Sequence, residues 1–147
     1  MGEHGILDYN NIIDGIYIGT NMCCQTHFEE ELKKEGIVAD ISLEADRVDA
    51  PFGVDFYLWL PVKDQTPPTP DQLQVGVTAL QVLVKLKQKI YVHCKNGHGR
   101  APTLVTAYLI KKGLSVAEAL ALVKHQRPAV HFQKNQEQAL EEFSKNQ

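Results

Sequence analysis

Cys94 and Arg100 are separated by five residues, among them Gly97 and Gly99. A deprotonated cysteine is a strong nucleophile. The planar guanidinium of arginine binds two oxygens of one phosphate group at once, which lysine cannot copy. The glycines let the backbone curl so that several N–H groups face one anion, where a Cβ would obstruct the curve. The spacing therefore predicts an anion-binding loop with a nucleophile inside it, suited to attack on phosphorus.

The elements on either side of this loop are a predicted strand over 89–93 and a predicted helix over 100–112. A strand–loop–helix junction directs backbone N–H groups and the positive end of the helix dipole at one point. Such a field stabilises a dianionic phosphate and the thiolate form of a cysteine at its centre. The predicted phosphate-binding residues are Lys95, Asn96, Gly97, His98, Gly99 and Arg100.

The rest of the chain alternates strand and helix patterns. We predict two short strands around an Asp-Gly turn in 11–19, a helix over 26–35, and strands over 37–43 and 56–62. Thr69 and Ser115 are predicted to cap two helices, and an amphipathic helix is predicted near the end of the chain. This alternation predicts an α/β fold: a single domain over 1–147, with a central, mostly parallel twisted sheet flanked by helices.

Composition excludes several classes of protein. The 147 residues suit about one domain, and 15 Lys+Arg against 18 Asp+Glu give a formal net charge of -3. That balance argues against a nucleic-acid-coating protein and against a polybasic membrane anchor. No segment is apolar enough for stable membrane insertion, and no secretory signal is recognised. We therefore expect a cytoplasmic protein, with Cys23 and Cys24 as ordinary buried thiols rather than partners that protect an oxidised Cys94.

His93-Cys94-x5-Arg100 after a strand resembles the phosphate-binding loop of the cysteine-dependent protein tyrosine and dual-specificity phosphatases. The resemblance covers nearly the whole chain, and the size suits the compact dual-specificity type. Two further patterns are similar to the mitochondrial-type lipid phosphatase branch and its microbial relatives. They are Asp64-x-Thr66-x-Pro68-Thr69 and Arg127-Pro128-x-Val130.

The resemblance implies a role for each site residue. Cys94 would form a phosphocysteine, and Arg100 would hold the charge of the transition state. Asp64, 30 residues before Cys94, would be the general acid and then the general base. Asp71 is a rival acid, but its place in the first turn of a helix already explains it. Gln136 is a candidate for positioning the attacking water, or a helix-surface amide.

No cofactor and no metal are expected. His93 is interpreted as a hydrogen-bonded core group that shapes the loop, because no spaced His, Cys or Asp partners are recognised around it. Lys95 and His98 suggest a basic pocket. The alternative is that both side chains are simply exposed to solvent. The family usually has Ser or Thr after the arginine, and here that residue is Ala101. We expect a less stabilised thiolate and slow hydrolysis of the phosphoenzyme, with Thr103 pointing elsewhere.

The resulting hypothesis is a phosphomonoester hydrolase of the protein tyrosine and dual-specificity type, with protein phosphotyrosine, with or without phosphoserine and phosphothreonine, as the favoured substrate class. A phosphatase of the same fold that acts on a phospholipid or another small phosphomonoester is the alternative. A weakened phosphate-binding module, suggested by Ala101, is a second one, and a rhodanese-like or arsenate-reducing thiol enzyme is a third. The partners expected are phosphorylated substrates alone, with a monomeric chain and no nucleic acid.

Overall fold

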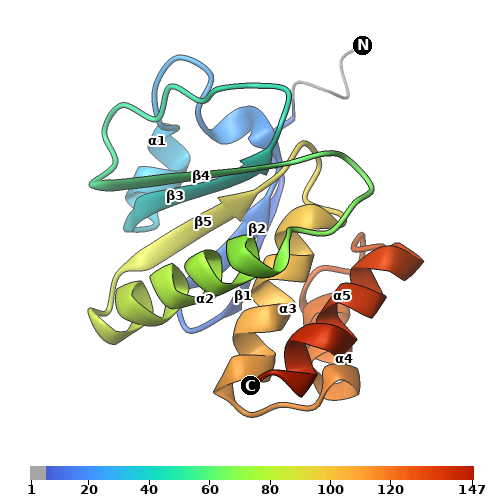
Figure 1. Cartoon of the computed structure of the whole chain (residues 1–147). Helices are drawn as coiled ribbons and strands as arrows, with labels where there is room; N and C mark the ends of the chain where they lie inside the picture. Colours follow the sequence, from blue (N-terminus) through green and yellow to red (C-terminus); the bar gives the residue numbers. More distant parts are fainter. Residues whose placement is uncertain (1–5) are drawn as a thin grey trace.

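The computed structural model describes residues 6–147, which fold around a five-stranded sheet (Figure 1). From one edge to the other, the strands are β1 (Tyr9–Ile13), β2 (Ile16–Gly19), β5 (Lys89–His93), β3 (Ile37–Glu44) and β4 (Phe56–Val62). β1 and β2 are antiparallel, and the other pairs are parallel. The predicted α/β fold with a mostly parallel sheet is therefore confirmed.

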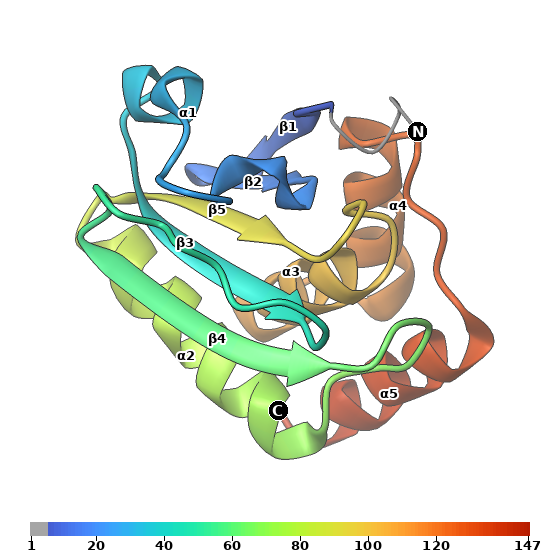
Figure 2. The same cartoon turned by 90° about the horizontal axis from the view of Figure 1, so that it is seen from above.

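Helices cover the two faces of the sheet unequally (Figures 1 and 2). One face carries α2 (Pro70–Lys85), α3 (Arg100–Lys112), α4 (Val116–Gln126) and α5 (Lys134–Lys145). The other face carries the short helix α1 (Glu30–Lys34) and a 3-10 turn, η2 (Asn21–Cys23). Two separate hydrophobic clusters follow from this division.

Alternation along β5 assigns its side chains to these two clusters. Ile90 and Val92 belong to the larger core beneath the four helices, whereas Tyr91 belongs to the smaller one on the α1 face. Successive side chains of a strand point to opposite faces, so His93 shares the α1 face with Tyr91. The loop that follows β5 thus begins directly after His93, whose side chain lies on the opposite side of the sheet from α3.

Local signals in the sequence place most element boundaries correctly. Thr69 and Ser115 each form a capping box, with Gln72 and Glu118 respectively. The predicted helix over 26–35 is wrong in its first half, because only Glu30–Lys34 is helical. The amides of Phe28 and Glu29 donate instead to carbonyls of Phe52 and Cys23, so tertiary bonds replace the first helical turn.

None of the helices in the described part of the chain has the length and apolar character that crossing a membrane requires.

Candidate active site

The loop from Cys94 to Gly99 connects the end of β5 to the start of α3, as predicted. Its carbonyl groups are held by donors that lie outside the loop. Arg127 donates from Nε to the carbonyl of Gly97 at 3.0 Å and from Nη2 to that of Asn96 at 2.9 Å. The carbonyls of Lys95 and His98 accept backbone bonds at 3.0 Å and 2.7 Å from residues 21 and 131. The loop is therefore held in place by hydrogen bonds that its carbonyl groups accept.

The amides of the same loop have no such partners. Among residues 6–147, no group accepts a hydrogen bond from the backbone N–H of residues 95–99. Backbone N–H groups without an intramolecular acceptor, directly before the N-terminus of a helix, are free to bind an anion. This arrangement agrees with the anion-binding loop that the sequence predicts.

The two glycines in the loop meet different requirements. Gly97 has φ +72°, and a Cβ there would lie 2.7 Å from the carbonyl oxygen of Gly19. A Cβ on Gly99 would come within 3.0 Å of the side-chain amide of Gln136. Gly97 therefore permits the backbone curve, as predicted, and Gly99 permits Gln136 to approach the loop.

A cavity of about 200 Å³ opens over the loop. It is lined by Asp64, Gln65, Cys94, Lys95, Asn96, His98, Gly99, Arg100, His131, Gln133 and Gln136. All predicted site residues except Gly97 are in this lining, so the fold brings them together. The sequence reasoning missed Gln65, His131 and Gln133, because nothing in their own spacing marks them as pocket residues.

Cys94 and Arg100 lie at the bottom of the cavity, each only 3% exposed. The Arg100 Nη1 donates to the carbonyl of Val62 at 2.9 Å, which anchors the guanidinium to the end of β4. Its Nη2 lies 3.5 Å from Oδ1 of Asp64, whose side chain is 65% exposed. The carboxyl group thus stands at the mouth of the cavity while the sulfur and the guanidinium stand at its base.

Gln136 is part of the cavity wall rather than of an exposed helix surface, being 1% exposed. Its Oε1 accepts from the amide of Gln133 at 2.8 Å, and its Nε2 donates to the carbonyl of Thr66 at 3.3 Å. The side chain therefore joins the start of α5 to the loop that carries Asp64. The reading of Gln136 as a surface amide is wrong.

The basic groups at the rim differ in charge. Burial, followed by the nearby charge of Arg127, holds the pKa of His98 below its usual value of 6.5. The His98 imidazole is accordingly neutral near pH 7, and it adds a hydrogen-bonding group rather than a positive charge. Lys95 lines the same cavity, so the predicted basic character of the rim rests on Lys95 and not on His98.

The helix that follows the loop lacks a hydroxyl directed at Cys94. Ala101 is fully buried, and Thr103 Oγ1 donates to the carbonyl of Gly99 at 2.7 Å. The prediction that Thr103 points elsewhere is therefore confirmed.

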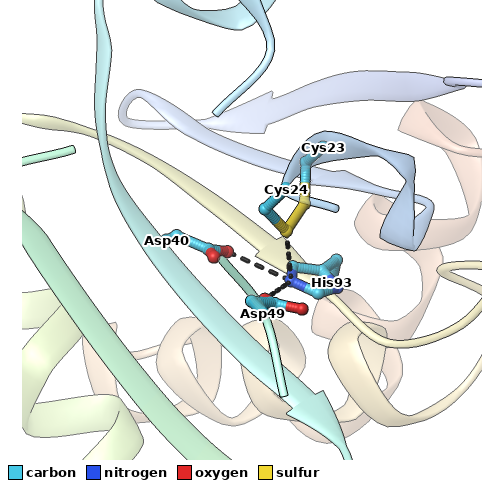
Figure 3. A group of neighbouring side chains, drawn as sticks. All are labelled: Cys23, Cys24, Asp40, Asp49 and His93. Carbon is cyan, nitrogen blue, oxygen red and sulfur yellow. Dashed lines mark hydrogen bonds and ion pairs between the residues drawn. A yellow bond between two sulfur atoms is a disulfide. The ribbon is translucent and has the colours of Figure 1, made fainter. Parts of the chain in front are cut away.

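His93 directly precedes Cys94 in the chain and is fully buried. Figure 3 shows its side chain beside those of Asp40, Asp49 and Cys24. Its Nε2 lies 2.7 Å from Oδ2 of Asp49 and 3.1 Å from Oδ1 of Asp40, and its Nδ1 lies 3.2 Å from the carbonyl oxygen of Cys94. Burial alone would lower the pKa of His93, but the charges of Asp40 and then Asp49 raise it to about 10. The interpretation of His93 as a hydrogen-bonded core group that contacts the loop is confirmed.

Two expectations for the surroundings of His93 are wrong. The fold does surround it with Cys and Asp side chains, which β3, η2 and a loop bring from distant parts of the sequence. Cys23 and Cys24 are buried as expected, but their sulfurs are joined in a disulfide rather than present as thiols. Cys94 is the free cysteine of the described chain.

A family model described as "Dual specificity phosphatase, catalytic domain" matches residues 16–146. The chain therefore belongs to this family and has the α/β fold of that family.

Curated relatives carry both protein and lipid phosphatase names. Human phosphatidylglycerophosphatase and protein-tyrosine phosphatase 1 is 40% identical over 79 residues, which cover 53% of this chain and 39% of that protein. Human dual specificity phosphatase 28 is 33% identical over 106 residues, which cover 68% of this chain and 58% of that protein. The matches thus span roughly two fifths to three fifths of these relatives.

Solved structures agree over almost the full length. The crystal structure of PTPMT1 superposes with a TM-score of 0.80 at 27% identity, covering 95% of both chains. The crystal structure of human DUSP28 superposes with a TM-score of 0.84 at 22% identity, covering 94% of this chain and 93% of that one, and shows the shared fold.

Proposed function

We propose that this phosphatase hydrolyses phosphomonoesters through a phosphocysteine on Cys94. The observation that carries the proposal is the convergence of four features on one cavity. Cys94 and the Arg100 guanidinium are buried at its base, the loop residues whose backbone N–H groups have no acceptor line it, and the Asp64 carboxyl group stands at its mouth. A single tetrahedral anion can accept hydrogen bonds from Arg100 and from the backbone N–H groups, so these donors need no second anion.

In the first step the Cys94 thiolate attacks phosphorus in line with the ester oxygen. The S–P bond forms as the P–O bond to the leaving group breaks. Asp64, as the neutral acid, gives its proton to the departing oxygen, so that no free alkoxide or phenoxide is released. Arg100 and the amides of residues 95–99 hold the charge on the phosphoryl oxygens throughout.

In the second step water attacks the phosphocysteine. The Asp64 carboxylate takes the proton of the water, the P–O bond forms, and the S–P bond breaks to return the thiolate and release phosphate. Gln136 would orient this water, since its amide is buried in the cavity wall and tied to the Asp64 loop through Thr66. Its position beside Gly99 puts a donor and an acceptor near the phosphorus site.

Protein phosphotyrosine is the substrate class we favour. Cys94 is 3% exposed and lies at the base of a recess, so a phosphate on a long aryl side chain reaches it more easily than one on a short alkyl side chain. A relative named as a protein-tyrosine phosphatase supports this assignment.

A phospholipid head group is the second candidate, and a specific feature favours it. A neighbouring hollow of about 200 Å³ shares Lys95 and Asn96 with the first cavity and adds Arg47 to its lining. Two cations beside the phosphate site suit a substrate with a second anionic group, such as the phosphodiester of a phosphatidylglycerophosphate. Two relatives carry phosphatidylglycerophosphate phosphatase activities in their names.

The test compares the purified chain with its Cys94→Ser variant on p-nitrophenyl phosphate, a small substrate with few binding requirements. Turnover in the first and none in the second supports the phosphocysteine route. Turnover that survives the substitution refutes it. Relative kcat/KM on a phosphotyrosine peptide, a phosphothreonine peptide and phosphatidylglycerophosphate then ranks the substrate classes. Trapping with Asp64→Ala identifies what stays bound in an extract.

A further inference from the structure

Five side chains that the proposed hydrolysis does not use gather directly behind the loop (Figure 3). They are Cys23, Cys24, Asp40, Asp49 and His93. All five are buried, and each offers one potential ligand atom within 4.8 Å of every other. None of them lines the cavity over Cys94. The cluster is therefore a closed site, separate from the candidate active site.

The register of the sheet explains how these residues meet. His93 pairs with Ser42 across β5 and β3, and Asp40 is two residues before Ser42. The side chains of Asp40 and His93 therefore share the α1 face of the sheet. Asp49 comes from the connection between β3 and β4, and the two cysteines come from η2 and the residue after it.

The cluster holds more buried acceptors than donors. Neither carboxylate oxygen of Asp40 accepts a hydrogen bond from any described residue, and neither does Oδ1 of Asp49. The single Nε2 of His93 faces Asp49 at 2.7 Å, Asp40 at 3.1 Å and the Cys24 sulfur at 3.6 Å. One N–H donates one good bond, so two of these three acceptors stay without a partner. Buried carboxylate oxygens in that state are costly.

The balance of charge also permits a divalent ion here. Two buried carboxylates are balanced by one imidazolium and by the guanidinium of Arg47, which lies 3.5 Å from Oδ1 of Asp49. A divalent cation in place of the imidazole proton, bound by the two carboxylates and one thiolate, would be neutral overall once Arg47 is counted. That balance is what a dry interior requires of an ion and its ligands.

We propose that the reduced protein binds one divalent metal ion, of the zinc type, in this cluster. The ligands are Nε2 of His93, one oxygen each from Asp40 and Asp49, and the thiolate of Cys24, whose sulfur is the one that lies 3.6 Å from Nε2 of His93. Nitrogen, sulfur and carboxylate donors in a closed set of four suit tetrahedral Zn²⁺. Ligands bound at ~2.0–2.3 Å lie roughly 3.3–3.8 Å apart, so His93 and the two carboxylates need to separate by only a few tenths of an ångström to about one ångström.

The metal would influence the loop through the second nitrogen of the His93 ring. Metal on Nε2 fixes the remaining ring proton on Nδ1, which lies 3.2 Å from the carbonyl oxygen of Cys94. That N–H would then donate to the carbonyl and hold the backbone of Cys94 in place. His93 is thus a positioning residue: the ion and the loop bind opposite nitrogens of one imidazole.

The disulfide and the metal are alternative states of the same sulfurs. In the structure the two sulfurs are bonded to one another, and a disulfide sulfur is not a thiolate ligand. A water-soluble phosphine opens the bond by supplying two electrons and becoming its oxide, with water as the source of the oxygen and of the two thiol protons. Metal binding then displaces the proton of the ligand thiol and that of Nε2 into solvent.

The experiment measures metal content in the full chain without a metal-binding tag. Phosphine-reduced protein is incubated with zinc, passed over a desalting column and analysed by inductively coupled plasma mass spectrometry. We expect about one zinc per reduced chain and close to none per disulfide-bonded chain. Cobalt in place of zinc should give a thiolate-to-cobalt charge-transfer band in the near ultraviolet, which reports the sulfur ligand directly.

Matched variants separate this cluster from chance binding elsewhere. Cys24→Ser and Asp40→Asn should lose most of the bound zinc, and Cys24→Ser should also lose or weaken the cobalt band. Cys94→Ser, which removes the cysteine next to His93 but leaves the cluster intact, should retain both. Circular dichroism establishes that each variant is folded, and a variant that is not folded is replaced by Asp49→Asn. Reduced, folded wild type without zinc, or zinc content and cobalt spectrum unchanged in Cys24→Ser, would overturn the proposal.

Discussion

The loop after β5 and the cluster behind it have opposite sets of unpaired polar groups. The loop presents donors without acceptors, namely the amides of residues 95–99 and part of the Arg100 guanidinium. The cluster presents acceptors without donors, namely both carboxylate oxygens of Asp40 and Oδ1 of Asp49. The two regions meet at consecutive residues, because His93 belongs to the cluster and Cys94 to the loop.

This difference explains why one region is open and the other closed. A substrate anion must enter and leave, so the donors of the loop line a cavity. A resident cation does not exchange during turnover, so the acceptors of the cluster are sealed beneath η2 and the β3–β4 connection. Alternation along one strand is enough to send the two sets of side chains to opposite sides of the sheet.

The largest effect is expected for Cys94→Ser. Replacing the nucleophilic sulfur with a hydroxyl should lower kcat on p-nitrophenyl phosphate by about 10⁴-fold or more, because the serine hydroxyl is not deprotonated here. Steady-state kinetics measures the loss. The same variant should remain folded and bind zinc as the wild type does, because Cys94 is not a ligand of the cluster. A variant that loses zinc together with activity would show that the two regions are not separable.

Asp64→Asn should lower kcat by about 10²–10⁴-fold, because the amide cannot protonate the leaving oxygen or accept a proton from water. The loss should be larger for an alkyl phosphate than for p-nitrophenyl phosphate, since p-nitrophenolate leaves without a proton. A leaving-group series measures this dependence. Asp71→Asn, an exposed carboxylate in the first turn of α2, is the matched control and should retain full activity. Equal losses in both variants would remove Asp64 from the mechanism.

Arg127→Met should loosen the loop without touching the cluster. The buried guanidinium holds the carbonyls of Asn96 and Gly97, and methionine fills similar space without any donor. We expect kcat/KM to fall by about 10–100-fold and vanadate to bind more weakly, because misplaced amides no longer converge on the anion. Leaving these carbonyls unpaired should also cost about 2–4 kcal/mol of stability in a denaturant titration.

The control for this change is Lys124→Met on the exposed side of α4. It removes a cation from the same helix without breaking a bond to the loop, so its kinetics and stability should match those of the wild type. If zinc content falls in Arg127→Met but not in Lys124→Met, the conformation of the loop affects metal binding in the cluster, although the two regions share no ligand.

The sequence predicted the loop well because its signals are local. The end of a strand, two glycines and the start of a helix all fall within residues 93–100. Cys94 and Arg100 lie in the same short stretch. The capping residues Thr69 and Ser115 were recognised for the same reason, since a capping box spans only four residues.

The sequence could not predict the cluster, because its members are brought together by the pairing of strands and by loops, and not by their spacing along the chain. Asp40 meets His93 only once β3 and β5 pair in parallel, and Asp49 arrives through an irregular loop. The support from Arg127 to the loop was hidden in the same way, since it joins the end of α4 to residues 30 positions earlier. The short α1 was misjudged because bonds to distant carbonyls replaced its first turn.

Ala101→Ser should have the smallest effect, a faster second step by about 10-fold. In this structure Ala101 is fully buried at the start of α3, and the hydroxyl of Thr103 is committed to Gly99. A serine hydroxyl at position 101 would donate to the sulfur as the S–P bond breaks, and a hydrogen bond to a charged group is worth about 1.5 kcal/mol or more. Rapid-quench kinetics would show the burst of p-nitrophenol unchanged and the steady state accelerated. Equal lifetimes of the phosphoenzyme in both proteins would mean that the amides and Arg100 already stabilise the leaving thiolate fully, so that the loop lacks no donor at all.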